Sequence, residues 1–305
     1  MAKELQAKVY SDSVTVACVN FKTIVGDKAA ALEKIKDFTA KAANQGANII
    51  LFPETALTSF SGFPPEEASV VAETVPGPAT AEIWKVAAQH NVYVCFGLVE
   101  RVDEKFYNSA PVVGPTGVLG VYRKVHILQA DPLKVGAGRE RWATRGSEYP
   151  LIETPWGPIG VSICYDTYCF PEASRAYALR GARLLLHLTA SPLLPDMPIE
   201  DSRNFHNTTL GARAIENNMF IACANFVGKQ GPFTYFGHSA IYGPKQGHMN
   251  YHIYAGPAGT EEEIIMATLD LAIREKLLIQ VKYILDDRRP ETYFPLVADR
   301  KSKMD

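Results

Sequence analysis

The sequence predicts an α/β fold built as one large domain. Strand-length apolar segments alternate with segments whose apolar residues recur at helical spacing. Of the 305 residues 47% are hydrophobic, which is enough for a large buried core. No Ser/Gly-rich linker or run of like charges divides the chain. We therefore expect strands that are buried on both faces, with the helices outside them.

The first half of the chain is expected to hold two helices, at 30–46 and 80–91. Both place apolar residues at helical spacing, and the first ends on Gly46, a residue that helix ends favour. A polar, Pro-rich loop is expected at 53–67. The expected strands of this half are 13–20, 48–52, 92–100, 108–117 and 118–127.

The second half repeats the alternation, with helices expected at 171–181 and 203–218. The expected strands are 157–164, 182–190, 219–228, 237–244 and 262–271. We take 1–285 as a single domain and 286–305 as a C-terminal tail. Because the tail carries Tyr293 and Phe294 among polar residues, we expect it to pack on another surface, such as a second subunit.

The charge pattern excludes several classes of partner. The net charge is -2, the pI is about 6.4, and the Lys and Arg residues are scattered, so neither nucleic acid nor an acidic membrane surface is an expected partner. The N-terminal stretch is polar, and the longest apolar runs are far too short to span a bilayer. These features predict a cytoplasmic protein.

The five cysteines do not form a disulfide or metal pattern. Cys18, Cys95 and Cys223 lie within apolar strand patterns and are expected to be small buried side chains. Cys164 and Cys169 do not form a CxxC pair, and the seven histidines show no HExxH spacing. The sequence therefore predicts no metal and no other cofactor.

Three reactive residues share one feature, because each lies at the end of an apolar strand pattern. Glu54 follows "IILFP", Lys124 falls within "VLGVYRKVHI", and Cys164 ends "GPIGVSI". Taken singly, each has an ordinary interpretation as a packing, loop or surface residue. Active sites gather at strand ends in α/β folds, so together the three indicate a catalytic group.

A Glu–Lys–Cys group has a coherent mechanism. A thiol is only slightly ionised near neutral pH and needs a base, which Glu54 supplies. Lys124 raises the thiolate fraction and stabilises negative charge on a substrate oxygen, and the backbone N–H of Tyr165 completes an oxyanion hole. His126 is a minor candidate for the same site, and its alternative interpretation is a hydrogen-bonded structural histidine.

These residues are similar to those of the nitrilase superfamily of carbon–nitrogen hydrolases, along nearly the whole chain. The pieces that carry the resemblance, in chain order, are "NIILFPETAL", "YRKVHI", "ERWATRGSEYPLIETPWGPIGVSICYD", "FPEASRAYALRGARLLLHLTAS", "ARAIENNMFIACANFVG", "GHSAIYGP" and "LDDRRPETY". Any one of them is weakly specific, whereas the ordered set is highly specific.

The resemblance implies a four-layer αββα sandwich that assembles through helix-mediated dimers, whose C-terminal tails often reach across the interface. It makes Glu54 the general base, Lys124 the stabiliser of the oxyanion and intermediate, and Cys164 the nucleophile. It also implies a second glutamate between Lys124 and Cys164, which orients the lysine or the substrate. Glu140 fits that position, and Glu148 is the alternative, with a surface loop residue as its ordinary interpretation.

Two features depart from the family pattern. "CYDTYCFPE" has one extra residue before Phe170, which leaves open how Tyr168, Cys169 and Phe170 line the pocket. The loop at 127–139 matches no family role, although it borders the substrate in the family.

The residues after the nucleophile bear on the substrate. Name-giving nitrilases usually carry a Trp there, whereas "CYD" is closer to the amidase, omega-amidase and carbamoylase branches. We expect hydrolysis of a small amide or carbamoyl compound through a thioester, with release of ammonia. A nitrilase is the alternative, and a non-catalytic binding relative or an acyltransferase stays open.

The expected pocket is apolar or flat, in keeping with the aromatic residues around the site. The residues that we expect to contact the substrate, besides Tyr165, are Asp166, Phe60, Phe63, Tyr168 and Ser191.

Overall fold

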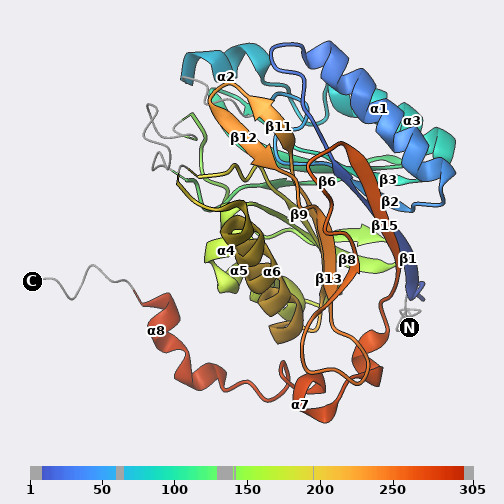
Figure 1. The fold of residues 1–305 in the computed structure, drawn as a ribbon, viewed down its shortest axis with the longest axis vertical. Coiled ribbons are helices and arrows are strands. Elements are labelled where there is room, and N and C mark those ends of the chain that lie inside the picture. The colour runs from blue at the N-terminus through green and yellow to red at the C-terminus, as the bar shows by residue number, and fades with distance from the viewer. Residues whose placement is uncertain (1–8, 60–64, 129–139, 141, 195, 299–305) are drawn as a thin grey trace, which may run out of the picture.

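The computed structural model describes residues 9–59, 65–128, 140, 142–194 and 196–298, and it contains two large β-sheets that pack face to face (Figure 1). Helices cover the outer face of each sheet, which gives the four-layer αββα sandwich that the resemblance implies. Phe60 and Phe63, most of the loop at 127–139, and the last seven residues lie outside the described residues.

The first sheet has seven strands. Its strands, in spatial order, are β15 (Glu263–Asp270), β1 (Ser13–Asn20), β2 (Ile49–Leu51), β3 (Tyr93–Cys95), β5 (Lys105–Gly114) and β4 (Leu98–Val102), with β6 (Gly117–Arg123) also paired to β5. Strands β1, β2 and β3 run parallel, and the other pairs are antiparallel. The helices α1 (Lys28–Asn44) and α3 (Pro78–His90) pack on the outer face.

The second sheet has six strands. In spatial order they are β14 (His252–Ala255), β13 (Ala240–Gly243), β10 (Phe220–Ala224), β9 (Leu184–Leu188), β8 (Gly157–Ile163) and β7 (Ile152–Thr154). Strands β8, β9 and β10 are parallel. The helices on this side are α4 (Tyr165–Cys169), α5 (Pro171–Leu179) and α6 (Ile199–Glu216). A hairpin of β11 (Val227–Gln230) and β12 (Phe233–Phe236) forms a separate pair.

The main core lies between the two sheets. Val16 of β1, Leu51 of β2, Leu186 of β9 and Ala222 of β10 belong to one buried cluster, so the inner faces of both sheets are apolar. Alternate residues point outward to a second and a third cluster under the helices. Strands such as β2, β9 and β10 are therefore apolar along their whole length.

The structure corrects several sequence expectations in detail. The expected loop at 53–67 contains the start of a helix, α2 (Pro65–Val71), and the expected strand at 92–100 is two strands, β3 and β4. The segment after Cys164 is the short helix α4. A single hydrophobic pattern did not separate β3 from β4, because the break at Phe96 and Gly97 is apolar too.

The C-terminal segment runs along the outside of the domain. It contains α7 (Ile279–Lys282), a turn at Pro290–Thr292 and α8 (Phe294–Val297), and α8 projects away from the sheets in Figure 1. Phe294 is 73% exposed and Val297 is 82% exposed. The expected packing of this tail stays a prediction.

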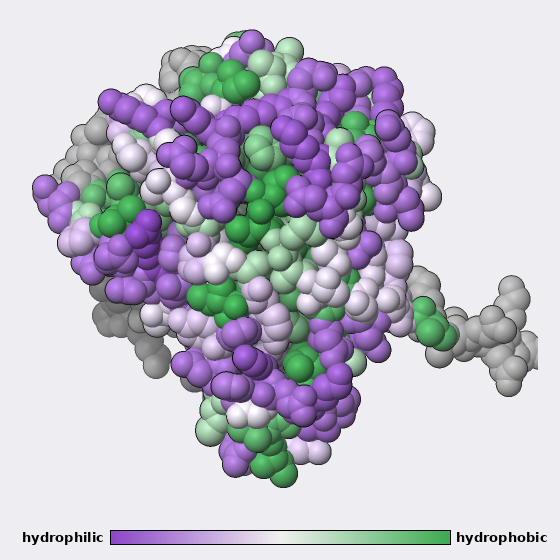
Figure 2. Space-filling model, turned by 45° about the vertical axis from the view of Figure 1, so that its right-hand side comes forward, coloured by the Kyte–Doolittle hydropathy of each residue, from purple (hydrophilic) through white to green (hydrophobic). Residues whose placement is uncertain are grey.

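The molecular surface is mixed in character. On the face drawn in Figure 2, hydrophilic residues form large areas and hydrophobic residues form smaller groups between them. Within the described ranges no helix combines the length and the hydrophobicity that a bilayer crossing requires.

Candidate active site

Glu54 lies three residues beyond the end of β2, in a tight turn that is completely buried. The turn continues into Thr55, which has a left-handed backbone (φ 50°). Gly97 packs directly on this turn, since a Cβ at Gly97 would lie 2.0 Å from the Thr55 nitrogen. The Glu54 side chain is 1% exposed, and its Oε2 accepts a hydrogen bond from the Ala190 N–H at 2.9 Å. The turn after β2 thus holds the Glu54 carboxylate beside the end of β9.

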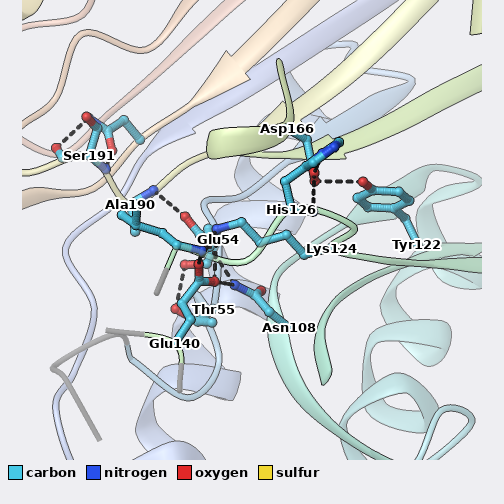
Figure 3. A network of polar contacts seen from close by, with 12 residues as sticks. Glu54, Thr55, Asn108, Tyr122, Lys124, His126, Glu140, Asp166, Ala190 and Ser191 are labelled. Atoms are coloured by element: carbon cyan, nitrogen blue, oxygen red, sulfur yellow. Dashed lines mark hydrogen bonds and ion pairs between the residues drawn. The ribbon is translucent and has the colours of Figure 1, made fainter. Parts of the chain in front are cut away.

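Lys124 follows directly after β6 and points into the same space. Its backbone N–H donates to the Asn108 carbonyl at 2.9 Å, and its carbonyl accepts from the Gly146 N–H at 2.8 Å. The ammonium donates to Glu54 Oε1 at 2.8 Å and to both oxygens of Glu140 at 2.9 Å (Figure 3). The side chain is 2% exposed, so this is a fully buried cation between two carboxylates.

Of the two glutamates considered for the second acidic position, Glu140 is the one beside Lys124. Glu140 is completely buried, and its Oε2 also accepts from the Leu128 N–H at 2.8 Å. Glu148 is exposed on the surface. The structure therefore places the alternative candidate away from the lysine.

Asn108, in β5, completes this polar cluster. Its Nδ2 donates to Glu54 Oε1 at 2.8 Å and to Glu140 Oε1 at 2.7 Å, so one amide group bridges both carboxylates (Figure 3). The sequence motifs do not single out this residue. The available signal was a polar Asn inside a buried strand, since a buried amide needs hydrogen-bonding partners.

The charges in the cluster set the protonation of each group. Burial acts to lower the pKa of Lys124, but the Glu140 and Glu54 carboxylates outweigh it, so the pKa is raised and the amine stays protonated. Burial raises the pKa of Glu140, and the Lys124 ammonium opposes that shift. A stably charged ammonium beside the two glutamates is thus the main electrostatic feature of the site.

Cys164 sits at the sharp junction between β8 and α4. Its backbone has φ 46° and ψ -104°, an unusual conformation for a residue with a side chain, and its N–H donates to the Leu188 carbonyl at 2.7 Å. Burial and, next, the Glu54 carboxylate raise the pKa of the Cys164 thiol to about 12, while Lys124 acts in the opposite direction. The resting thiol is therefore protonated at neutral pH.

Asp166 does not face the substrate space, contrary to the sequence expectation. It is completely buried, and it accepts hydrogen bonds from the Tyr122 hydroxyl at 2.6 Å and from the His126 backbone N–H at 2.8 Å (Figure 3). The His126 ring Nδ1 lies 2.8 Å from the same carboxylate, and the ring stacks on Phe170. His126 thus has the contacts of the structural histidine that was its alternative interpretation.

A cavity of about 370 Å³ opens beside the Cys164 thiol. Tyr165, Tyr168, Cys169 and Ser191 all line it, together with residues of the segment after β9 and of α6. Tyr165 is the first residue of α4, so its N–H has no acceptor within that helix. The three strand-end residues and this cavity therefore occupy one location. Among the described residues, no group of three His, Cys, Asp or Glu side chains is arranged to hold a metal ion.

Comparison with known proteins gives the same family throughout. A model of the carbon–nitrogen hydrolase family matches residues 15–276. A nitrilase from Pyrococcus abyssi is 30% identical over 263 residues, covering 86% of this chain and 92% of the relative. Omega-amidase NIT2 from Homo sapiens is 27% identical over 297 residues, covering 94% and 93%.

Solved structures of one amidase are similar over almost the whole chain. A variant of the amidase from Nesterenkonia sp. AN1, of the nitrilase superfamily, has a TM-score of 0.75 and 25% identity, covering 95% of this chain and 100% of its own. Another variant carries the acetamide moiety of fluoroacetamide on its active-site cysteine, with a TM-score of 0.74, 26% identity, and coverage of 93% and 97%. This chain therefore belongs to the carbon–nitrogen hydrolase family, and it is a hydrolase of carbon–nitrogen bonds with the αββα fold of the nitrilase superfamily.

Proposed function

We propose that this enzyme is an amidase that hydrolyses a small amide or carbamoyl compound through a thioester on Cys164. The observation that carries the proposal is the Lys124 ammonium, held between Glu54 and Glu140 at 2.8–2.9 Å beside the thiol and its cavity. Each group that acyl transfer requires is present there: a nucleophile, a base and a fixed positive charge.

The first half-reaction forms the thioester. Because the thiol has a raised pKa, it gives up its proton only as it attacks, and Glu54 is the acceptor. The Cys164 sulfur bonds to the amide carbon, and the carbonyl oxygen gains negative charge. Glu54 then passes the proton to the amide nitrogen, the C–N bond breaks, and ammonia leaves.

The second half-reaction returns the free enzyme. Water attacks the thioester carbon while Glu54 takes one of its protons. The C–S bond breaks, the carboxylic acid leaves, and the proton on Glu54 returns to the Cys164 sulfur. The sum is amide plus water giving acid plus ammonia, with no external oxidant or reductant.

Lys124 and the Tyr165 N–H are the proposed stabilisers of the oxyanion. The ammonium carries a full positive charge in a dry site, and the N–H belongs to the first turn of α4 next to the nucleophile. An oxyanion donor of this kind contributes about 3 kcal/mol to the transition state. The role left for Glu140 is to hold the Lys124 ammonium in place beside Glu54, through the hydrogen bonds that both of its oxygens accept.

Nitrile hydrolysis is the second candidate, and the 30% identity to the Pyrococcus abyssi nitrilase favours it. The same cysteine can attack a nitrile carbon to give a thioimidate, which two waters convert to acid and ammonia. Tyr165 and Asp166, in place of the Trp that follows the nucleophile in the name-giving branch, favour the amide.

Ammonia release is the test that separates these functions. Short aliphatic amides, aryl amides, monoamides of dicarboxylic acids, N-carbamoyl amino acids and the matching nitriles are offered to the enzyme, with Cys164→Ala as the inactive control. Cys169→Ala is the matched cysteine control, since Cys169 lines the same cavity and does not belong to the group of Glu54, Lys124 and Glu140. Release from amides that is lost only in Cys164→Ala, with a trapped acyl–enzyme mass, supports the proposal. Release from nitriles alone contradicts it.

We also propose a homodimer, or a larger assembly, in which the C-terminal segment 286–305 packs on a neighbouring copy. The exposed apolar side chains Phe294, Leu296 and Val297 support the proposal, because such groups are usually covered. Light scattering measures the number of subunits in the assembly of the full chain and of a chain that ends at Leu285. The same number of subunits in both contradicts the proposal. The cytoplasmic location expected from the sequence stays a prediction.

A further inference from the structure

The cavity beside Cys164 has a strongly apolar lining. Its described lining includes the apolar or aromatic side chains Leu128, Tyr168, Leu194, Met197 and Phe205. They come from separate parts of the chain, and they enclose about 370 Å³ next to the thiol. A space of this size accommodates an acyl group of several carbon atoms, larger than formyl or acetyl.

One wall of the cavity is aromatic and uncharged. The Tyr168 ring contacts the Phe205 ring, with centroids 5.4 Å apart, and the His206 ring, with centroids 4.8 Å apart. His206 is 1% exposed, and burial, with His238 and His187 acting in the same direction, lowers its pKa well below the usual range. The imidazole is therefore neutral at physiological pH and offers no positive charge to an anionic substrate.

The entrance of the cavity carries a negative charge. Asp201 lines the cavity from the first turn of α6, and it is exposed to solvent. Among the described residues it forms no ion pair, whereas its neighbour Glu200 is paired with Arg203 at 2.7 Å. None of the described lining residues is a Lys or an Arg. Among the described lining residues, a substrate carboxylate would thus meet a carboxylate at the rim and a largely apolar, uncharged surface inside.

We infer that the enzyme selects amides whose acyl group is apolar and uncharged, and rejects amides that carry a second carboxylate. This inference rests on the proposed amidase function and narrows its substrate class. Met197 and Phe205 are the residues that favour the apolar chain, and Asp201 is the residue that disfavours the anion. An anion that enters such a pocket loses hydration without gaining a cationic partner among the described lining residues.

A matched substrate pair tests the selectivity. Hexanamide and the monoamide of adipic acid have the same number of carbons, and they differ by a methyl group against a carboxylate at the far end. We expect kcat/KM for hexanamide to be at least ~100-fold higher, because buried groups left unpaired discriminate strongly. A ratio near one, or a preference for the adipic monoamide, overturns the inference.

Charge reversal at the rim tests the part assigned to Asp201. Asp201→Lys is expected to reduce the hexanamide preference by ~5-fold or more, since it replaces repulsion by attraction at the entrance. The control is Glu200→Lys, which makes the same charge change on the adjacent exposed residue, outside the cavity lining. If both variants change the ratio of the two kcat/KM values equally, the effect comes from the overall electrostatic field of the protein, and the role assigned to Asp201 is wrong.

Measurements of binding without turnover test this inference separately from the proposed function. The affinities of Cys164→Ala for the two compounds, measured by ligand-observed NMR, report the pocket without any turnover. If the native enzyme releases ammonia from none of the amides and carbamoyl compounds of the screen while the variant still prefers hexanamide, the amidase proposal fails and the pocket inference stands. If the variant binds both compounds equally, the pocket inference fails whatever the turnover shows.

Discussion

The Asp166 carboxylate accepts two hydrogen bonds from His126, one from the backbone N–H and one from the ring Nδ1, both at 2.8 Å. Its other oxygen accepts from the Tyr122 hydroxyl at 2.6 Å. Tyr122 and His126 flank Lys124 at a distance of two residues on either side. Asp166 lies two residues after Cys164, so this one side chain connects the turn at Cys164 to the segment that carries Lys124.

Weakening the hydrogen bonds of Asp166 to His126 and Tyr122 is expected to lower kcat more than it changes KM. Asp166→Asn replaces one acceptor oxygen by a donor, and we expect kcat to fall by ~10- to 100-fold with KM within about threefold, because Lys124 loses its fixed position relative to Cys164. Tyr122→Phe removes only one of the three bonds, and its effect is expected to be smaller. Steady-state kinetics measures both, and a rise in KM alone at unchanged kcat would contradict the positioning role.

The thiol pKa should respond in opposite directions to the two neighbouring charges. The Glu54 carboxylate raises the pKa of Cys164, so Glu54→Gln is expected to lower it from about 12, increasing the thiolate fraction at a given pH. Lys124 lowers that pKa, so Lys124→Met is expected to raise it further. Ultraviolet titration of the thiolate, with Cys164→Ala as the blank, measures the shifts.

The turnover rate should fall in both Glu54→Gln and Lys124→Met, although the pKa of the Cys164 thiol is expected to fall in the first variant and to rise in the second. We expect a loss of ~100- to 10,000-fold for Glu54→Gln, because general base catalysis contributes about that much. A variant that has more thiolate but less activity would show that Glu54 is needed for proton transfers beyond the ionisation of the thiol. If Glu54→Gln kept full activity, Glu54 could not be the base.

The sequence predicted the reactive residues better than their supports. Glu54, Lys124 and Cys164 each interrupt an apolar pattern at a strand end, and that is visible in the linear sequence. Asn108 and Tyr122 lie inside strands, and nothing in the pattern says which side chains they face. Their partners are 32 to 54 residues away, so only the folded sheets bring them together.

The same reasoning explains which parts of the fold were predicted. Long amphipathic helices such as α1 and α6 and apolar strands such as β9 have a clear period, and they lie where the pattern placed them. The short helices α2 and α4 span seven and five residues. A segment of one or two turns has too few residues to establish a helical period.

Loss of the Asn108 side chain should remove a hydrogen bond from the Glu54 and the Glu140 carboxylate at once. Asn108→Leu keeps the approximate size but removes the Nδ2 donor that Glu54 and Glu140 share. We expect the free energy of unfolding to fall by about 1–3 kcal/mol, since two buried acceptors lose a partner. Denaturant unfolding measures this change, and activity should fall with it. Ser109→Ala, which affects the neighbouring bond to Glu100, controls for general damage to β5 and should spare Glu54.

A methyl group at Gly97 should displace Glu54, the proposed general base, without changing its carboxylate. The Cβ of Gly97→Ala would lie 2.0 Å from the Thr55 nitrogen and 2.6 Å from the Glu54 carbonyl carbon, and both are backbone atoms that move only with the whole turn. Because the Glu54 carboxylate is fixed by Lys124, Asn108 and Ala190, a shift of the turn breaks that geometry, and we expect activity to fall by ~100-fold or more.

The matched control for this substitution is Gly259→Ala, whose Cβ would meet only a Glu263 carboxylate oxygen at 3.6 Å, an ordinary contact. The two variants add the same atom, so a comparison of their kcat values isolates the effect of the Glu54 turn. Circular dichroism confirms that each variant is folded. Equal kcat values in two folded variants would mean that the site tolerates movement of Glu54, and that its carboxylate is not held in the catalytic position by the β2 turn.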